Sequence, residues 1–237
     1  MKKIEEILTK YEYPGRGILI GLNEFGTEIF LAYFIMGRSE NSKNRVFELD
    51  EEKNLKTKPF KKENLKNEEL IIYTAVTKFN GNIIVSNGNH TETIVKGLKN
   101  GLSFKESLKN TNFEPDPPIL TPRISAILNI TSKKISYTFS IIKNYGNSKN
   151  CTGRFFFEYE NITPATGHLI HTYKPKNNNI TNSFFGEPKL IKIPKNLNNF
   201  TESLWQALNE KNRISLFARS INLKTKEEKT KIININN

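Results

Sequence analysis

The sequence has a single cysteine, Cys151, and no run of about 18 apolar residues. One cysteine cannot close a disulfide within the chain, so we expect a protein of a reducing compartment. The missing apolar run excludes a membrane-spanning helix. The first fifteen residues, MKKIEEILTKYEYPG, also lack the apolar stretch that follows the lysines of a secretory signal. We therefore expect a cytoplasmic protein.

Arginine is scarce although the chain is basic. The formal net charge is +12, yet 29 of the 36 basic residues are lysine and 31 asparagines accompany them. This bias is spread over the whole chain and comes with no nucleic-acid-binding motif, so we expect neither a nucleic-acid nor a membrane partner. The few arginines are informative because a guanidinium binds phosphate or carboxylate through two hydrogen bonds. Five of the seven lie at the ends of apolar runs: Arg16, Arg38, Arg45, Arg123 and Arg154.

The pattern of apolar runs predicts an α+β domain with antiparallel sheets. Strands are expected at 17–23, 27–37, 70–79, 82–88, 123–131, 134–143, 153–161, 167–174 and 213–223. Helices are expected at 3–11, after Asn89, after Ser103 and at 200–211. Residues 50–69 and 175–199 are expected to form surface loops. This order lacks the β-α-β alternation of a parallel sheet.

The 237 residues can bury a sizeable core without metals or disulfides. We find no domain boundary and expect one domain over 1–237. Residues 224–237 are expected to be a flexible tail, or else to add an edge strand at 232–235. The sequence leaves the oligomeric state open, including a homo-oligomer.

The segment 37–45, GRSENSKNR, follows a ten-residue apolar strand directly. It combines two arginines, one lysine, two serines and two asparagines with a glycine that lets the chain turn. Such a set of donors suits a phosphate or phosphoribosyl group. The alternative is a solvated loop of turn-forming residues.

Two further segments combine polar groups with a rigid backbone. Residues 86–92, SNGNHTE, form a strand-to-helix junction, where free backbone N–H groups can meet a ligand or where Asn89 can simply cap a helix. Residues 113–123, FEPDPPILTPR, place Glu114, Asp116 and Arg123 on a loop stiffened by prolines, which suits catalysis. The alternative for the second segment is a structural turn with a surface salt bridge.

The remaining chemically distinctive residues give little support for a metal or a nucleophile. Cys151 has no neighbouring base in the sequence, so we expect a small, half-buried residue rather than a nucleophile. His168 and His171 are three apart in an expected strand and should face opposite sides, so they cannot bind one metal together. No other cluster has zinc spacing, and we expect no metal and no cofactor.

Several of these segments, in the same order, resemble the IMP cyclohydrolase-like family, which includes the archaeal-type IMP cyclohydrolases and bacterial relatives. The resemblance covers about residues 11–175; the last sixty residues match no motif we can name. Its segments are YPGRG (13–17), GRSxNSxNR (37–45), SNGNHT (86–91), EPDPP (114–118), TPRI (121–124) and CTGRF (151–155). The resemblance implies a four-layer αββα sandwich of two antiparallel sheets, similar to N-terminal nucleophile hydrolases. Met1 is followed by a helix-like segment, so we expect no processed nucleophile.

The resemblance also implies a reaction, the closure of 5-formamidoimidazole-4-carboxamide ribonucleotide to IMP with loss of water. It implies purine nucleotides as substrate and product. The catalytic residues would be Tyr73, Glu114, Asp116 and Arg123, and which carboxylate is the base stays open. The substrate-binding residues would be Arg38, Ser39, Asn41, Ser42, Arg45, Asn87, Asn89, His90 and Thr121. Two alternatives remain, a non-catalytic purine-nucleotide-binding protein and an amidohydrolase that uses Cys151.

Overall fold

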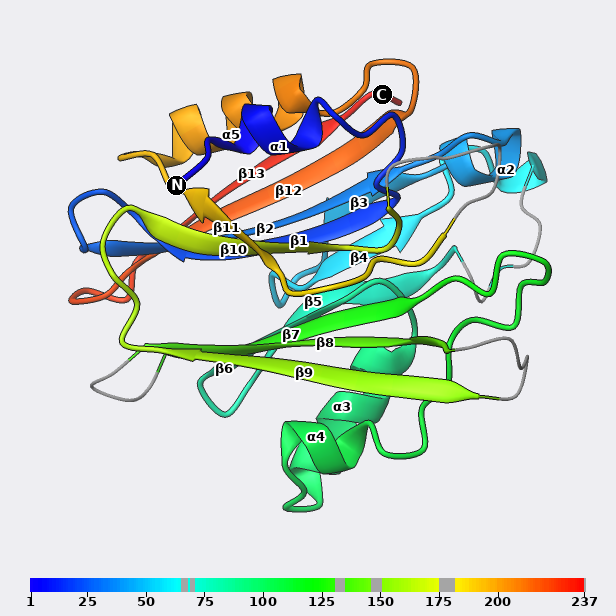
Figure 1. The fold of residues 1–237 in the computed structure, drawn as a ribbon, viewed down its shortest axis with the longest axis horizontal. Helices are drawn as coiled ribbons and strands as arrows, with labels where there is room; N and C mark the ends of the chain where they lie inside the picture. Colours follow the sequence, from blue (N-terminus) through cyan, green and yellow to red (C-terminus); the bar gives the residue numbers. More distant parts are fainter. Residues whose placement is uncertain (65–67, 69–70, 131–134, 146–150, 175–181, 237) are drawn as a thin grey trace.

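Two antiparallel β-sheets pack face to face and carry helices on their outer faces (Figure 1). The computed structural model describes residues 1–64, 68, 71–130, 135–145, 151–174 and 182–236. The expected α+β sandwich is confirmed. No helix in this described part is long and apolar enough to cross a membrane.

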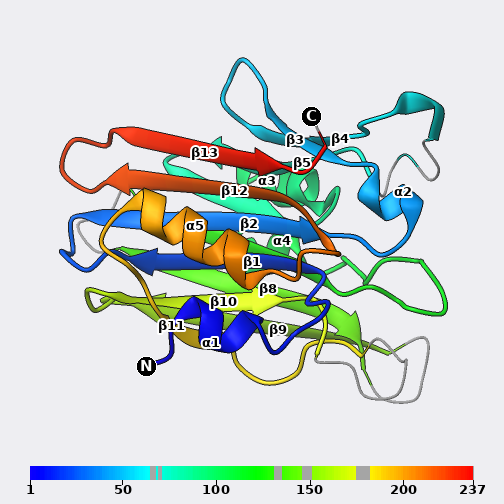
Figure 2. The same ribbon diagram turned by 90° about the horizontal axis from the view of Figure 1, so that it is seen from above.

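The first sheet has six strands in the order β11-β10-β1-β2-β12-β13. Its strands are β1 (Arg16–Leu22), β2 (Glu28–Met36), β10 (Thr166–His171), β11 (Lys189–Lys192), β12 (Arg213–Asn222) and β13 (Glu228–Asn234). Helices α1 (Ile4–Leu8) and α5 (Leu197–Ala207) cover its outer face (Figure 2). Packing between Phe30 of β2 and Phe200 of α5, with ring centroids 5.2 Å apart, is typical of this layer.

The second sheet has seven strands in the order β3-β4-β5-β6-β7-β8-β9. They are β3 (Val46–Leu49), β4 (Leu55–Lys58), β5 (Tyr73–Phe79), β6 (Asn82–Ser86), β7 (Arg123–Asn129), β8 (Ser136–Asn144) and β9 (Thr152–Glu160). Helices α3 (His90–Lys99) and α4 (Phe104–Ser107) lie on its outer face (Figure 1). Ser103 caps α4 as the sequence predicts, because its side chain accepts from the backbone N–H of Glu106.

The main core lies between the two sheets and follows the alternation of side chains along each strand. In β1, Ile18 and Ile20 belong to this inter-sheet core, whereas Leu19 packs under the helices of the first sheet. Arg16 lies two residues before Ile18 in β1, so both side chains point to the same face of the sheet. Its side chain is therefore directed between the sheets, at the end of the core.

The antiparallel registers bring distant segments to that end of the sandwich. Arg16 at the start of β1 pairs with Ile35 near the end of β2, and Arg123 at the start of β7 pairs with Ile142 near the end of β8. The short helix α2 (Glu40–Lys43) and the loop 113–122 project from the same end (Figures 1 and 2).

The structure differs from the sequence predictions mainly in short polar elements. The expected loop 50–69 contains β4 and a 3-10 turn at Lys62–Asn64, and the expected loop 175–199 contains β11. Helix α1 is shorter than 3–11. Helix α5 begins at Leu197 rather than 200, because the side chain of Asn196 caps it. Of the two alternatives for the tail, the structure has the edge strand, since β13 pairs with β12 along its whole length. The expected boundaries at residues 70, 131 and 134 lie outside the described residues.

Candidate functional site

Five buried polar side chains gather between the sheets at this end of the molecule. We call them the inter-sheet cluster: Arg16, Tyr33, Arg45, Tyr73 and Glu114. They come from β1, β2, the residue before β3, the start of β5 and the proline-rich loop. Their exposed fractions are 7%, 0%, 4%, 4% and 4% in that order. Residues far apart in the sequence thus meet in one buried polar site.

The two arginines of the cluster have unused hydrogen-bond donors. Nε of Arg16, and both Nε and Nη1 of Arg45, are buried and have no hydrogen-bond partner among the described residues. A buried N–H group without an acceptor costs about 1–3 kcal/mol, more when it is charged. A ligand with anionic or carbonyl oxygens would supply the missing acceptors.

Glu114 is the carboxylate that accompanies these guanidinium groups. Burial raises the pKa of Glu114, while Arg16, Arg123 and Arg45 favour its ionised form. Burial lowers the pKa of Arg16, but Glu114 raises it and the net pKa is well above the ordinary value. The pKa of Arg45 is lowered by burial and by the charge of Arg16. A carboxylate with a raised pKa is a stronger base than an exposed one.

Asp116, the other candidate base, is occupied in holding its own loop. Its Oδ1 accepts from the backbone N–H of Thr121 at 2.7 Å and its Oδ2 from the hydroxyl of Thr121 at 2.5 Å. The hydroxyl of Tyr173, which follows β10, lies 2.7 Å from the same Thr121 oxygen. The backbone N–H of Glu114 donates to the carbonyl of Thr121 at 2.9 Å. Asp116 and Thr121 therefore close the loop that presents Glu114.

Arg123, His90 and Asn89 form a second group next to Glu114. Nη1 of Arg123 donates to Oδ1 of Asn89 at 3.0 Å and lies 3.2 Å from Nδ1 of His90. His90 Nε2 lies 3.2 Å from the carbonyl of Ile124. Burial, then Arg123, lowers the pKa of His90 to about 3, so His90 is neutral and Nδ1 accepts from Arg123.

Gly88 provides the space in which these groups meet. A Cβ atom on Gly88 would lie 2.7 Å from Nη1 of Arg123, 3.4 Å from Nδ1 of His90 and 3.5 Å from Oε1 of Glu114. The absent side chain lets the guanidinium of Arg123 reach the neighbourhood of the Glu114 carboxylate.

Asn87 holds the backbone beneath this group. Its Nδ2 donates to the carbonyl of Pro122 at 2.9 Å, and its Oδ1 accepts from the N–H of Ile124 at 2.8 Å. The Asn87 amide thus bridges β6 to the start of β7 on both sides of Arg123. Both polar atoms of the Asn87 side chain are thus engaged by the backbone, and its expected substrate contact stays a prediction.

Arg38 and the helix α2 lie at the rim of the site. The guanidinium of Arg38 lies 4.2 Å from the ring centroid of Tyr13, and Tyr13 stacks on Tyr173 with centroids 5.7 Å apart. Ser39 and Ser42 form the capping box of α2, with Oγ atoms 3.0 Å apart. Ser39 and Asn41, but not Ser42, line a surface cavity of about 720 Å³ together with Asn44, Phe60 and Asn236.

The nine expected substrate-binding residues are therefore divided between two places. Arg45, Asn87, Asn89, His90 and Thr121 adjoin the buried groups, whereas Ser39, Asn41 and Ser42 lie on the rim with Arg38 beside them. Another surface cavity, of about 830 Å³, lies between the β3–β4 hairpin and α3 and contains none of these nine residues. A smaller cavity of about 310 Å³ is lined by Asn89, His90 and Arg123.

The structure tests three expectations for single residues. Asn89 occupies the N-cap position of α3, as one interpretation of the sequence had it, but its side chain makes no capping hydrogen bond and its Oδ1 accepts from Nη1 of Arg123. Cys151 was expected to be half-buried and is exposed. The expectation that His168 and His171 face opposite sides is confirmed, since His168 contacts Tyr137 of the second sheet at 2.7 Å and His171 packs against Tyr11 beside α1.

Sequence reasoning missed Arg16, Tyr33 and Tyr173 as site residues. Arg16 had a usable signal, since it is one of few arginines and follows a Pro-Gly turn. Tyr33 sits inside an apolar strand and has no such signal. Among the described residues, no group of three or more His, Cys, Asp or Glu side chains is arranged to hold a metal.

The fold and the site define an α+β two-sheet protein with a buried polar site of guanidinium, carboxylate and phenol groups at one end. The model of the IMP cyclohydrolase-like protein family matches residues 13–227, and the chain belongs to this family. A search of curated proteins finds no match.

Proposed function

We propose that this protein is an IMP cyclohydrolase that closes 5-formamidoimidazole-4-carboxamide ribonucleotide to IMP in purine biosynthesis. The observation that carries the proposal is the pair of buried arginines with unused donors beside Glu114. The substrate brings two carbonyl oxygens, on its formamido and carboxamide arms, and one N–H on each arm that must lose a proton. Family membership supports the same reaction.

Glu114 is the general base in this proposal. The carboxamide nitrogen attacks the formyl carbon and gives its proton to Glu114, while the formyl oxygen becomes an alkoxide. Arg16 and Arg45 stabilise that developing charge, and the hydroxyl of Tyr73 donates the proton that converts it to a hydroxyl. The hydroxyl then leaves as water together with the proton of the formamido nitrogen, and the proton held by Glu114 passes to Tyr73, which restores both groups. The products are IMP and one water molecule.

Orientation of the two arms is the other contribution of the site. Holding reacting groups at attack distance supplies up to about 7–11 kcal/mol in well-oriented intramolecular systems. In our proposal Arg123, held by Asn89 and His90, binds the carboxamide, and Thr121 forms the adjoining wall. Arg38, Ser39, Asn41 and Ser42 on the rim bind the ribose and 5′-phosphate.

The test is to mix the protein with the formamido ribonucleotide and follow the absorbance change of purine ring closure. We expect Glu114→Gln chiefly to lower kcat and Arg38→Ala chiefly to raise KM. The side chain of Lys229 on β13 is exposed, so Lys229→Gln serves as the control and should leave kcat and KM unchanged. A protein that binds IMP yet closes the ring no faster than buffer would contradict catalysis and favour a nucleotide-binding role.

A further inference from the structure

We propose that the outer edge of β9 pairs with the same strand of a second copy of this chain and forms a symmetric dimer. The strand is nine residues long and lies at the edge of the seven-stranded sheet (Figure 1). This inference is independent of the proposed function.

The outer edge of β9 is open and regular. The strand pairs with β8 through nine consecutive residue pairs, from Asn144↔Thr152 to Ser136↔Glu160, without a register shift. Its backbone makes no hydrogen bond to any other segment in the described part of the chain. Natural edge strands are normally protected by prolines, lysines or bulges, and residues 152–160 contain none of these. Such an edge is a template for another strand.

The strand is also rich in aromatic residues that the single chain covers only in part. Phe155, Phe157 and Tyr159 face the inter-sheet core, and Phe156 packs towards α4, 6.1 Å from the ring centroid of Phe104. All four rings are half-buried. Pairing with a further strand would cover the remainder of their surface.

A second copy is the partner because the sequence of β9 is complementary to itself in one antiparallel register. Residues that lie opposite each other in an antiparallel pair point to the same face of the sheet. The core-facing residues of the two copies therefore lie on one face only when the two-fold axis passes through a residue, not between two residues. Centring on Phe156 places Phe155 opposite the partner's Phe157, a favourable cross-strand aromatic pair. It also places Tyr159 opposite the partner's Gly153, where an aromatic ring covers a glycine.

The charges select the same register. Centring on Phe156 places Arg154 opposite Glu158, and the two-fold axis generates this pair twice. Shifting the centre to Phe155 places Arg154 opposite Phe156, and shifting it to Phe157 places Glu158 opposite Phe156.

Both charged side chains have contacts within the chain that the pairing would have to replace or share. Glu158 now forms an ion pair with Lys105 at 3.1 Å, in which the two side chains are 60% and 49% exposed, so the pair is weak. Arg154 donates through Nη2 to Thr111 and Asn112, and its Nε has no acceptor among the described residues.

The experiment is a charge swap read by sedimentation velocity on the full chain. We expect a wild-type dimer at micromolar concentration. Arg154→Glu places two carboxylates opposite each other, and Glu158→Arg places two guanidinium groups opposite each other, so each variant alone should dimerise at least about tenfold more weakly. Mixing the two variants restores both opposite-charge pairs and should give a 1:1 heterodimer. Lys229→Glu, a charge reversal on the other sheet's edge strand β13, is the control and should remain dimeric.

Each outcome decides the proposal. Recovery of the dimer only in the mixture supports the Phe156-centred register, because a variant that had merely misfolded would not be rescued. A wild-type chain that is monomeric up to high micromolar concentration overturns it. Single variants that dimerise as well as the wild type overturn it too, because the interface then lies elsewhere.

Discussion

The hydroxyl of Tyr33 on β2 lies 2.8 Å from the hydroxyl of Tyr73 on β5, so a hydrogen bond joins the two sheets at the site. Burial, with the neighbouring Tyr73, raises the pKa of Tyr33 well above its ordinary value, and Tyr33 therefore keeps its proton. In our proposal Tyr33 donates to the oxygen of Tyr73. The proton of Tyr73 is then directed away from Tyr33 and towards the substrate.

This relationship predicts different effects for two matched variants. Tyr73→Phe removes the proposed proton donor and should lower kcat by about 10²-fold or more. Tyr33→Phe removes only the group that orients Tyr73 and should lower kcat by about tenfold with little change in KM. Steady-state kinetics of ring closure measures both. An equal loss of kcat in the two variants would contradict the role of Tyr33 as the group that orients Tyr73.

The two carboxylates of the proline-rich loop should respond differently to neutralisation. Glu114→Gln removes the proposed base and should lower kcat by about 10²–10⁴-fold. Asp116→Asn keeps the base but weakens the contacts to Thr121, so it should lower the melting temperature more than kcat. Kinetics and thermal unfolding of both variants separate these roles. A larger loss of kcat in Asp116→Asn would make Asp116 the base.

The pH dependence of kcat/KM should follow the raised pKa of Glu114, because this ratio reports the ionisation of the free enzyme. A base works only when deprotonated, so activity falls as the pH drops through the pKa of Glu114. Since burial raises that pKa above the ordinary 4.5, the acid limb of the profile should lie above pH 4.5. The measurement is kcat/KM against pH for the wild type and for Glu114→Asp. An acid limb at or below pH 4.5 would argue against Glu114.

Gly88→Ala should disturb catalysis by steric contact alone. The new Cβ would lie 2.7 Å from Nη1 of Arg123, a flexible group that can move away. We therefore expect a folded protein with displaced Arg123 and a kcat about 10–10²-fold lower. Gly101→Ala is the complementary control, because at φ +78° it adds backbone strain while its Cβ would meet nothing within 4 Å, so it should lower stability and leave kcat unchanged. Unchanged kinetics in Gly88→Ala would mean that Arg123 does not need this position.

The fold could be predicted where apolar residues alternate over long strands, and could not where strands are short and polar. Strands β1, β2, β7 and β12 are long and apolar, and their ranges match the expected ones within a few residues. Strand β4 has the sequence LKTK, which no apolar pattern marks, and it exists because its backbone pairs with β3 and β5. Pairing between distant strands is a tertiary effect that local patterns do not contain.

The site could be predicted where a residue type is rare or a motif is rigid. Scarcity of arginine pointed to Arg45 and Arg123, and the prolines pointed to Glu114. The sequence could not separate Glu114 from Asp116, because that distinction depends on which carboxylate Thr121 engages. Tyr33 was not predictable either, since a tyrosine among apolar strand residues is indistinguishable from a core residue until its partner Tyr73 is placed.

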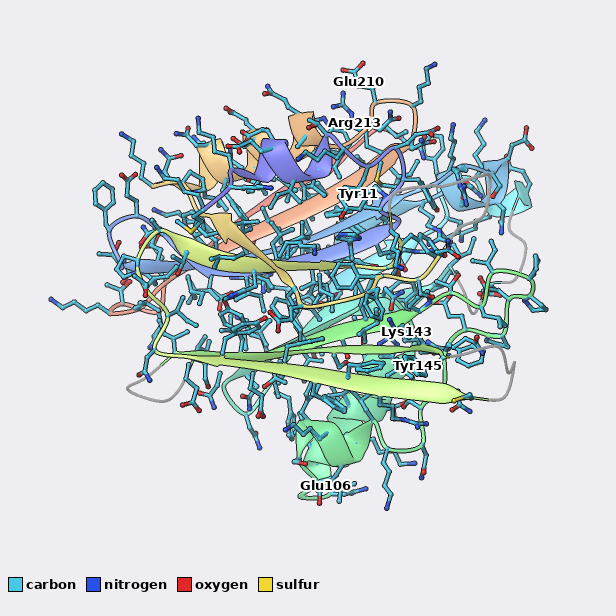
Figure 3. All side chains as sticks on the ribbon, in the orientation of Figure 1. Tyr11, Glu106, Lys143, Tyr145, Glu210 and Arg213 are labelled. Carbon is cyan, nitrogen blue, oxygen red and sulfur yellow. The ribbon has the colours of Figure 1, made fainter. Side chains whose placement is uncertain are left out.

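Outside the site, a buried histidine should make the stability of the protein sensitive to acid. His171 is fully buried, and of its surroundings only the backbone of Tyr173 favours a charged ring. Its ring lies between those of Tyr11 (labelled in Figure 3) and Phe184, each with its centroid 4.6 Å away. Burial lowers the pKa of His171 from 6.5 to about 3, so the folded state excludes a proton that the unfolded state accepts below pH 6.5.

His171→Phe keeps an aromatic ring in this apolar place and removes the titration. For the wild type, the free energy of unfolding should fall below pH 6.5 by about 1.4 kcal/mol per pH unit through this residue. The free energy of unfolding of the variant, relative to that of the wild type, should therefore rise by about 2 kcal/mol between pH 7.5 and pH 5, because only the wild type takes up this proton on unfolding. Urea unfolding at the two pH values measures the gain. Tyr11→Phe changes the same packing without titrating in this range, so its effect should be equal at both pH values. A gain for His171→Phe that is also independent of pH would show that His171 is not buried as a neutral ring.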